Sequence, residues 1–139
     1  MSGPTTHERE RRATDGVTRL RLASGPALGP VLRRVVSMAL ARADWPVDRL
    51  DDAILVCDAL CAHTPAYARE GRVTFSLQAN EREAELRVHE LDVEDAEALL
   101  RDARLPVVGS VLEQVADRVS VQTDEDGASA QIAIVLSSN

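Results

Sequence analysis

The sequence predicts an α+β fold: a two-layer sandwich with a mixed, mostly antiparallel sheet and helices on one face. Two observations carry this prediction. Residues 72–79 and 83–90 alternate apolar and polar side chains on either side of a short turn, which is typical of a β-hairpin with one buried face. Residues 27–43 and 47–62 instead repeat apolar side chains every three or four positions, as amphipathic helices do. Hairpin strands beside separate helices favour this architecture over a parallel wound sheet.

The remaining elements complete the order β-α-α-β-β-α-α-β-β. They are a first strand, two later helices and two last strands, expected at residues 17–23, 94–104, 106–118, 119–122 and 130–136. Pro106 suits the first position of the second of these helices, because its missing N–H has no partner there. The polar residues 1–16 predict a disordered tail, so residues 17–139 are expected to form a single domain.

Composition excludes several function classes. The chain has 139 residues and a formal net charge of −7, and its only aromatic residues are Trp45, Tyr67 and Phe75. A net acidic chain with so few aromatic side chains is a poor candidate for direct nucleic-acid binding. No apolar run approaches the roughly 20 residues of a membrane span, and the N-terminus lacks the apolar core of a secretory signal. The sequence therefore predicts a cytoplasmic protein without a membrane anchor.

Two segments carry a family resemblance. Residues 52–60 read DAILVCDAL, and residues 111–119 read VLEQVADRV. The first is similar to a helix in which an acidic residue is followed four positions later by asparagine, and the second to a late helix that enters a strand through an Ala-Asp-x-Val run. With the order of elements over residues 17–136, they resemble the GHKL-type ATP-binding domain of bacterial anti-sigma-factor serine kinases. The resemblance implies the fold, a sigma factor or its antagonist as partner, homodimerisation, and an ATP site with Mg²⁺.

The nucleotide positions of that family hold other residues here. The resemblance places Asp58 at the catalytic acidic position and Ala62 at the asparagine position, where alanine cannot coordinate Mg²⁺. Asp92 matches the aspartate that contacts adenine, but Glu94 and Ala96 stand where glycines are expected. The sequence thus predicts weak or absent binding of ATP and Mg²⁺, no other cofactor and no metal site.

The phosphate lid of the family also departs from its pattern. This segment is glycine-rich in the family, but here residues 105–110 contain Gly109 alone. Pro106 removes a backbone donor, and Val107 and Val108 crowd the approach of a phosphate. Retained framework and lost phosphate chemistry together favour a non-catalytic anti-sigma-type regulator, which acts by binding a sigma factor or its antagonist.

The resemblance also indicates where a partner would bind. In the family the first helix contributes to sigma-factor contacts, and Arg33, Arg34 and Arg42 on the corresponding helix are the candidate contact residues. Arginine is common among the residues that dominate binding energy at protein interfaces. Two alternatives remain open: a serine/threonine protein kinase with an altered nucleotide site, and a small-molecule sensor. The sensor would use the vacated pocket, lined by Leu55, Ala62, Val107 and Val108.

Cys57 and Cys61 are four positions apart on the apolar stripe of the second helix. A redox switch or half of a metal site is one interpretation of this pair. Their Cβ atoms would lie about 5–6 Å apart, whereas a disulfide needs about 3.8 Å. Buried core residues are therefore the favoured interpretation. His89, on the polar face of a strand, is expected to be a surface residue and not a base.

Overall fold

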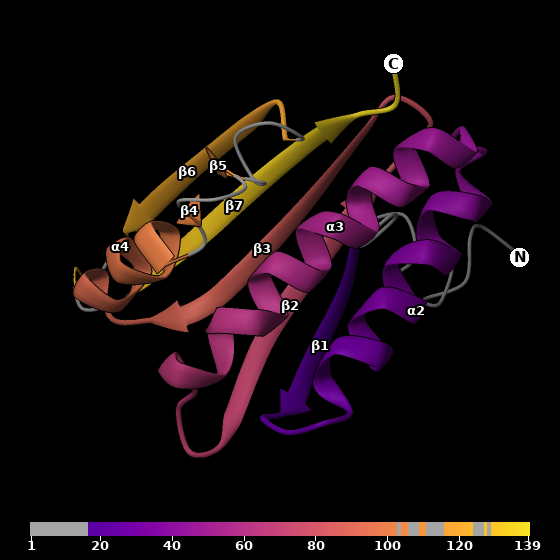
Figure 1. The fold of residues 1–139 in the computed structure, drawn as a ribbon. Helices are drawn as coiled ribbons and strands as arrows, with labels where there is room; N and C mark the ends of the chain where they lie inside the picture. The colour runs from indigo at the N-terminus through magenta and orange to yellow at the C-terminus, as the bar shows by residue number, and fades with distance from the viewer. Residues whose placement is uncertain (1–16, 103, 106–108, 111–115, 124–126, 128) are drawn as a thin grey trace, which may run out of the picture.

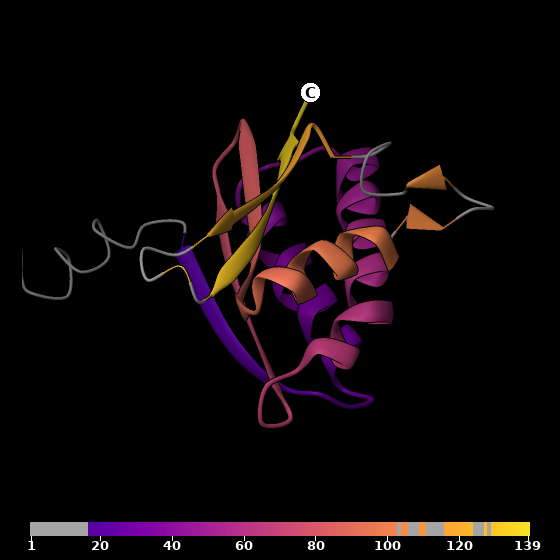
Figure 2. The ribbon, with the colours of Figure 1, turned by 90° about the vertical axis from the view of Figure 1, so that its left-hand side faces the viewer.

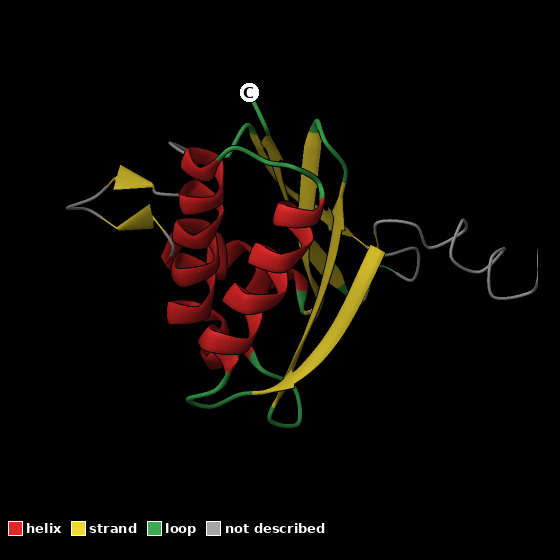
Figure 3. Ribbon diagram, turned by 90° about the vertical axis from the view of Figure 1, so that its right-hand side faces the viewer, coloured by secondary structure: helices red, strands yellow, loops and turns green. Residues whose placement is uncertain are grey.

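The computed structural model describes residues 17–102, 104–105, 109–110, 116–123, 127 and 129–139 (Figure 1). A five-stranded sheet carries three α-helices on one face, which confirms the predicted α+β sandwich (Figure 3). All pairings between its described strands are antiparallel, so the parallel neighbours of a mixed sheet are not found among them. The predicted tail, residues 1–16, lies outside the described residues.

The sheet runs in the order β1-β2-β3-β7-β6, so β1 and β6 form its two edges. Its strands are β1 (Val17–Ala23), β2 (Arg72–Ala79), β3 (Glu83–Leu91), β6 (Arg118–Thr123) and β7 (Ala130–Ser137). Each agrees with a predicted strand to within one residue at either end. The last strand of the chain lies in the interior of the sheet, between β3 and β6 (Figure 1).

The helix layer contains α2 (Leu28–Arg42), α3 (Val47–His63) and α4 (Val93–Asp102), with a 3₁₀ turn η1 (Thr64–Tyr67) after α3. Figure 2 shows the three helices on the same side of the sheet. Helix α2 buries one stripe of side chains at helical spacing, namely Leu28, Leu32, Val36 and Leu40. No described helix is long and apolar enough to cross a membrane.

The core lies between the sheet and the helices, and the strand register builds it in rows. Phe75 stands directly opposite Leu20 on β1 and Val88 on β3, and Val88 stands opposite Ile132 on β7. Phe75, Val88 and Ile132 are fully buried, while Leu20 is partly buried at the edge of the sheet. The apolar side chains of the alternating pattern therefore lie on the face of the sheet that the helices cover, and the polar side chains lie on the open face.

One predicted helix is wrong where the structure describes it. Arg104–Leu105 forms β4 and pairs antiparallel with β5 (Gly109–Ser110), and Arg118 already belongs to β6. Residues 106–108 and 111–115 lie outside the described residues. A glycine inside a helix costs about 1 kcal/mol relative to alanine, which disfavours a helix through Gly109. Gly109 instead pairs with Leu105 in extended backbone.

Two side chains tie the helix layer to one end of the sheet. Trp45, buried after α2, donates from Nε1 to the carbonyl oxygen of Asn80 in the β2–β3 turn at 2.7 Å. Arg49 of α3 donates from Nε to the carbonyl oxygen of Ser137 at 2.7 Å and forms an ion pair with Asp52. Hydrogen bonds to charged groups are worth about 1.5–3 kcal/mol. These links hold α3 against the end of β7.

Candidate functional site

The three arginines expected at the partner surface do not share one face of α2. Arg33 and Arg34 line a shallow hollow of about 380 Å³ together with Pro30, Ser37 and Ile54 of α3. Arg42 follows Arg33 by nine positions, which at 3.6 residues per turn rotates it by about half a turn to the opposite flank. The structure thus brings Arg33 and Arg34 together at the α2–α3 groove and places Arg42 elsewhere.

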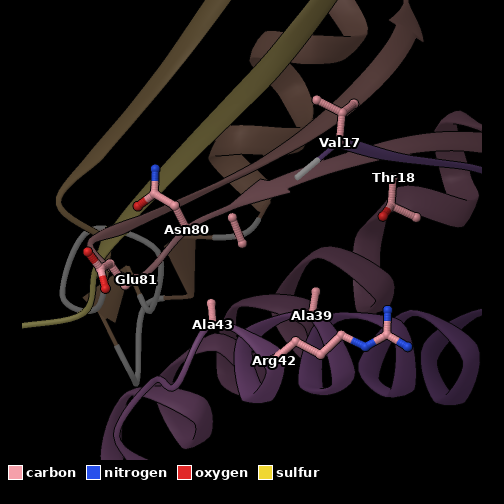
Figure 4. A pocket seen from close by; sticks show the side chains of 8 residues that line it. Val17, Thr18, Ala39, Arg42, Ala43, Asn80 and Glu81 are labelled. Atoms are coloured by element: carbon pink, nitrogen blue, oxygen red, sulfur yellow. The ribbon is translucent and has the colours of Figure 1, made fainter. Parts of the chain in front are cut away.

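Arg42 lines a separate pocket of about 440 Å³ at the start of β1 (Figure 4). The pocket lies between the C-terminal half of α2, the first residues of β1 and the β2–β3 turn. Figure 4 shows the Arg42 side chain extended along α2 on the side that faces Thr18. The other lining residues are Val17, Ala39, Ala43, Ala79, Asn80 and Glu81.

Asp58, the candidate catalytic carboxylate, lies beside Arg33. Its Oδ1 is 3.4 Å from Nε of Arg33, and both side chains are half exposed. One helical turn further on, at the family's asparagine position, Ala62 is exposed on the surface of α3. The position that would supply a Mg²⁺ ligand therefore carries a bare methyl group. In the part of the chain that the structure describes, no three metal-ligating side chains cluster together.

Asp92, the candidate adenine contact, directly precedes α4. Its carboxylate forms an ion pair with Arg69, and its carbonyl oxygen accepts a hydrogen bond from the N–H of Ala96 at 2.9 Å. Ala96, where the resemblance expects a glycine, is fully buried and packs in the core. Glu94 lies in the first turn of α4, where the helix dipole favours a carboxylate. These residues form the start of a helix. The side chains of Glu94 and Ala96 occupy the space that glycines would leave open there.

The residues expected to line a vacated small-molecule pocket are only partly described. Leu55 and Ala62 are exposed on α3. Val107 and Val108 lie outside the described residues, so the sensor alternative stays a prediction. His89 is half-buried on the open face of the sheet, where its Nε2 lies 2.6 Å from Oγ of Ser76.

The two cysteines are free thiols, as the favoured interpretation expected. Cys57 is fully buried in the core, and Cys61 is half-buried where α3 faces Gly29 of α2. Burial raises the pKa of Cys57 to about 12, with further contributions from Cys61 and from the Asp58 carboxylate. Burial, followed by Asp58, raises the pKa of Cys61 to about 11. Because the thiolate is the reactive form, these environments make both thiols unreactive at neutral pH.

The outer face of the helix layer exposes apolar side chains that the sequence analysis did not single out. On α2, Val31 and Met38 are 38% and 50% exposed, and Leu55 on α3 is 48% exposed. Arg34 lies between Val31 and Met38 along the helix, so this cation has an exposed apolar side chain three positions before it and another four positions after it. Arginine and methionine are both enriched at protein interfaces. The signal in the sequence is that Val31 and Met38 fall outside the buried stripe of α2.

Comparisons with known proteins find a structural match only. No family model matches the chain, and no curated protein sequence does. A chain from the crystal structure of the SiaB–SiaC complex of Pseudomonas aeruginosa superposes on this chain with a TM-score of 0.54 and 12% sequence identity. The superposition covers 99% of both chains. At this identity the match shows a common fold, and it agrees with the α+β sandwich that the family resemblance implied.

Proposed function

We propose that this protein is a non-catalytic regulator that acts by binding another protein through the outer face of α2. The observation that carries the proposal is the exposed arginine Arg34, flanked by the exposed apolar side chains Val31 and Met38. Such a mixture of a cation with apolar surface is the composition of interface centres and not of ordinary solvated helix faces. The similar chain of the SiaB–SiaC complex supports the proposal because it comes from a complex of two proteins.

The residues at the nucleotide positions support a role without phosphoryl transfer. Ala62 offers no oxygen to Mg²⁺, Asp58 pairs with Arg33, and Ala96 fills core space. A kinase needs a metal ligand and a phosphate cradle, and the described residues at these positions provide neither. From the family resemblance, we propose a sigma factor or the antagonist of an anti-sigma system as the partner. Homodimerisation stays a prediction that sedimentation velocity can test.

Charge reversal on α2 is expected to weaken capture of the partner strongly. Arg33→Glu would place a second carboxylate beside Asp58, so Arg34→Glu is the cleaner single variant, and Arg33→Glu/Arg34→Glu the stronger one. We expect Arg34→Glu to weaken the affinity for the partner about 30-fold or more, since removing a central interface arginine costs about 2 kcal/mol or more. Quantitative mass spectrometry of affinity-purified complexes measures this.

A matched control distinguishes an effect of the α2 face from an effect of the change in net charge. Arg82, in the β2–β3 turn, is also exposed, and Arg82→Glu makes the same change in net charge. We expect Arg82→Glu to leave capture unchanged, and thermal melts of all variants to overlay the wild type. Equal capture by wild type and Arg34→Glu would refute the proposed function.

A further inference from the structure

The outer edge of β1 presents unpaired backbone groups in the described structure. Strand β1 pairs only with β2, and no described strand lies on its other side. Directly after β1, the N–H of Ser24 donates to the carbonyl oxygen of Gly71 at 2.8 Å. Backbone groups alternate in direction along an antiparallel strand. The backbone N–H and C=O groups of the even-numbered residues of β1 therefore point toward β2. Those of four odd-numbered residues point outward: Val17, Arg19, Arg21 and Ala23.

An apolar flank of α2 lies next to this edge. Ala39 lines the pocket at the start of β1, together with Val17 and Thr18. Val35 and Val31 precede Ala39 by four and eight positions, so they continue the same side of the helix. Val31 is 38% exposed, and Val35 and Ala39 are half-buried. Figures 1 and 3 show α2 over the side of the sheet that ends in β1. The flank of α2 therefore lies above the outer edge of β1.

The opposite side of the same edge is basic. Leu20 and Leu22 of β1 pack against the core, so Arg19 and Arg21 project on the open face of the sheet. Arg21 has a single ion pair, to Glu70 at 4.0 Å, in which both side chains are largely exposed. Arg19 forms no ion pair with any described residue. Arg19 is thus free to meet a carboxylate beside the strand edge, and Arg21 can do so by exchanging its long, exposed ion pair with Glu70.

Charge decides between the occupants that could cover this edge. A second copy pairing antiparallel through β1 about Leu20 would set Arg19 directly opposite Arg21 of its partner, twice across the symmetry axis. Like charges directly opposite on neighbouring strands are destabilising. A strand with acidic side chains at these positions would instead form two opposite-charge pairs. Its alternate side chains would lie beneath α2 beside the apolar flank, and the pocket at the start of β1, with Arg42 and Asn80 in its lining, would form the polar end of this site.

We infer that the outer edge of β1 binds an extended, acidic segment of a protein partner, which adds to the sheet as a sixth strand. Carboxylates of the segment face Arg19 and Arg21 on the open side, and its apolar side chains pack under α2. Main-chain hydrogen bonds supply affinity in this mode, and the alternating side chains supply specificity. The inference rests on the proposed protein-binding function and adds a second contact surface to the α2 face.

A matched pair of variants at Arg21 tests the edge. Arg21→Ala removes the charge and keeps the outward N–H, whereas Arg21→Pro removes both, and proline is tolerated on edge strands whose N–H faces outward. The probe is a fluorescein-labelled hexapeptide of alternating glutamate and valine, read by anisotropy. We expect Arg21→Ala to weaken binding about two- to fivefold and Arg21→Pro to weaken it a further tenfold or more.

Three comparisons make the result decisive. A peptide with lysine in place of glutamate should not bind, and Arg101→Glu, which reverses an exposed charge on α4, should bind the acidic peptide like wild type. Circular dichroism checks that each variant is folded. Equal affinities of Arg21→Ala and Arg21→Pro, or equal binding of the lysine peptide, would overturn the inference. A homodimer in sedimentation velocity that Arg21→Pro dissociates would overturn it in favour of a second copy.

Discussion

Replacing Phe75 with alanine is expected to lower the free energy of unfolding by about 3–5 kcal/mol. Phe75 is the only phenylalanine of the chain, is fully buried, and stands in the row that links Leu20 to Val88 across three strands. Truncation leaves a cavity where the sheet meets the helices, because rigid neighbours close only part of the gap. With total stabilities of about 5–15 kcal/mol, such a loss brings the chain near unfolding.

Urea titration followed by the fluorescence of Trp45 measures this loss. Trp45 is the only tryptophan and is buried, so its emission reports the packing of the helix layer on the sheet. Leu55→Ala is the matched control, since it removes a large apolar side chain that is 48% exposed and should cost less than about 1 kcal/mol. Equal losses for the two variants would contradict the described core.

The free energy of unfolding is expected to fall as the pH rises from about 9 to about 12, because the Cys57 thiol is buried. In the folded protein burial raises its pKa to about 12, whereas an unfolded cysteine titrates near 9. The folded state therefore holds the proton longer, and its advantage is complete below pH 9 and lost as the pH passes 12. One pKa unit corresponds to about 1.4 kcal/mol, so the loss for Cys57 approaches about 4 kcal/mol.

The chain has no lysine to titrate in this window, but Cys61, whose pKa burial raises to about 11, adds to the same fall in stability. Urea midpoints measured at intervals from pH 7 to 12 give the pH profile. Cys57→Ala is the control: it should lower stability at pH 7, but its profile should be flatter, so the two curves converge at high pH. Parallel curves would show that Cys57 does not titrate with the raised pKa.

Much of the fold follows from local sequence patterns. The alternation in residues 72–79 and 83–90 identifies both hairpin strands and their buried face, since a half-covered sheet demands that period. The spacing of Leu28, Leu32, Val36 and Leu40 identifies α2 for the same reason. Strand order is different, because β7 pairs with β3 across about 45 residues of chain and no local pattern encodes that partner. The helix expected at 106–118 is wrong at Gly109 and Ser110, which form a strand, because the glycine disfavours a helix there.

In the candidate site too, some features follow from residue identity and others depend on tertiary packing. That Ala62 offers no oxygen to a metal ion follows from residue identity alone. The ion pair between Arg33 and Asp58 could not, because it depends on how closely α2 and α3 approach. The edge position of β1, and with it the outward groups at Arg19 and Arg21, depends on long-range strand order. The two proposed contact surfaces thus depend on tertiary packing more than on sequence motifs.

The central claim is that this protein works by binding a protein partner and not by nucleotide chemistry. One measurement tests it most directly: affinity capture from native lysate by the full chain, in ATP-depleted buffer and in buffer with millimolar Mg·ATP, quantified by mass spectrometry. The account predicts one enriched partner, captured equally in both buffers and captured much less by Arg34→Glu. Capture that depends on Mg·ATP, with phosphate transferred to the captured protein, would contradict it.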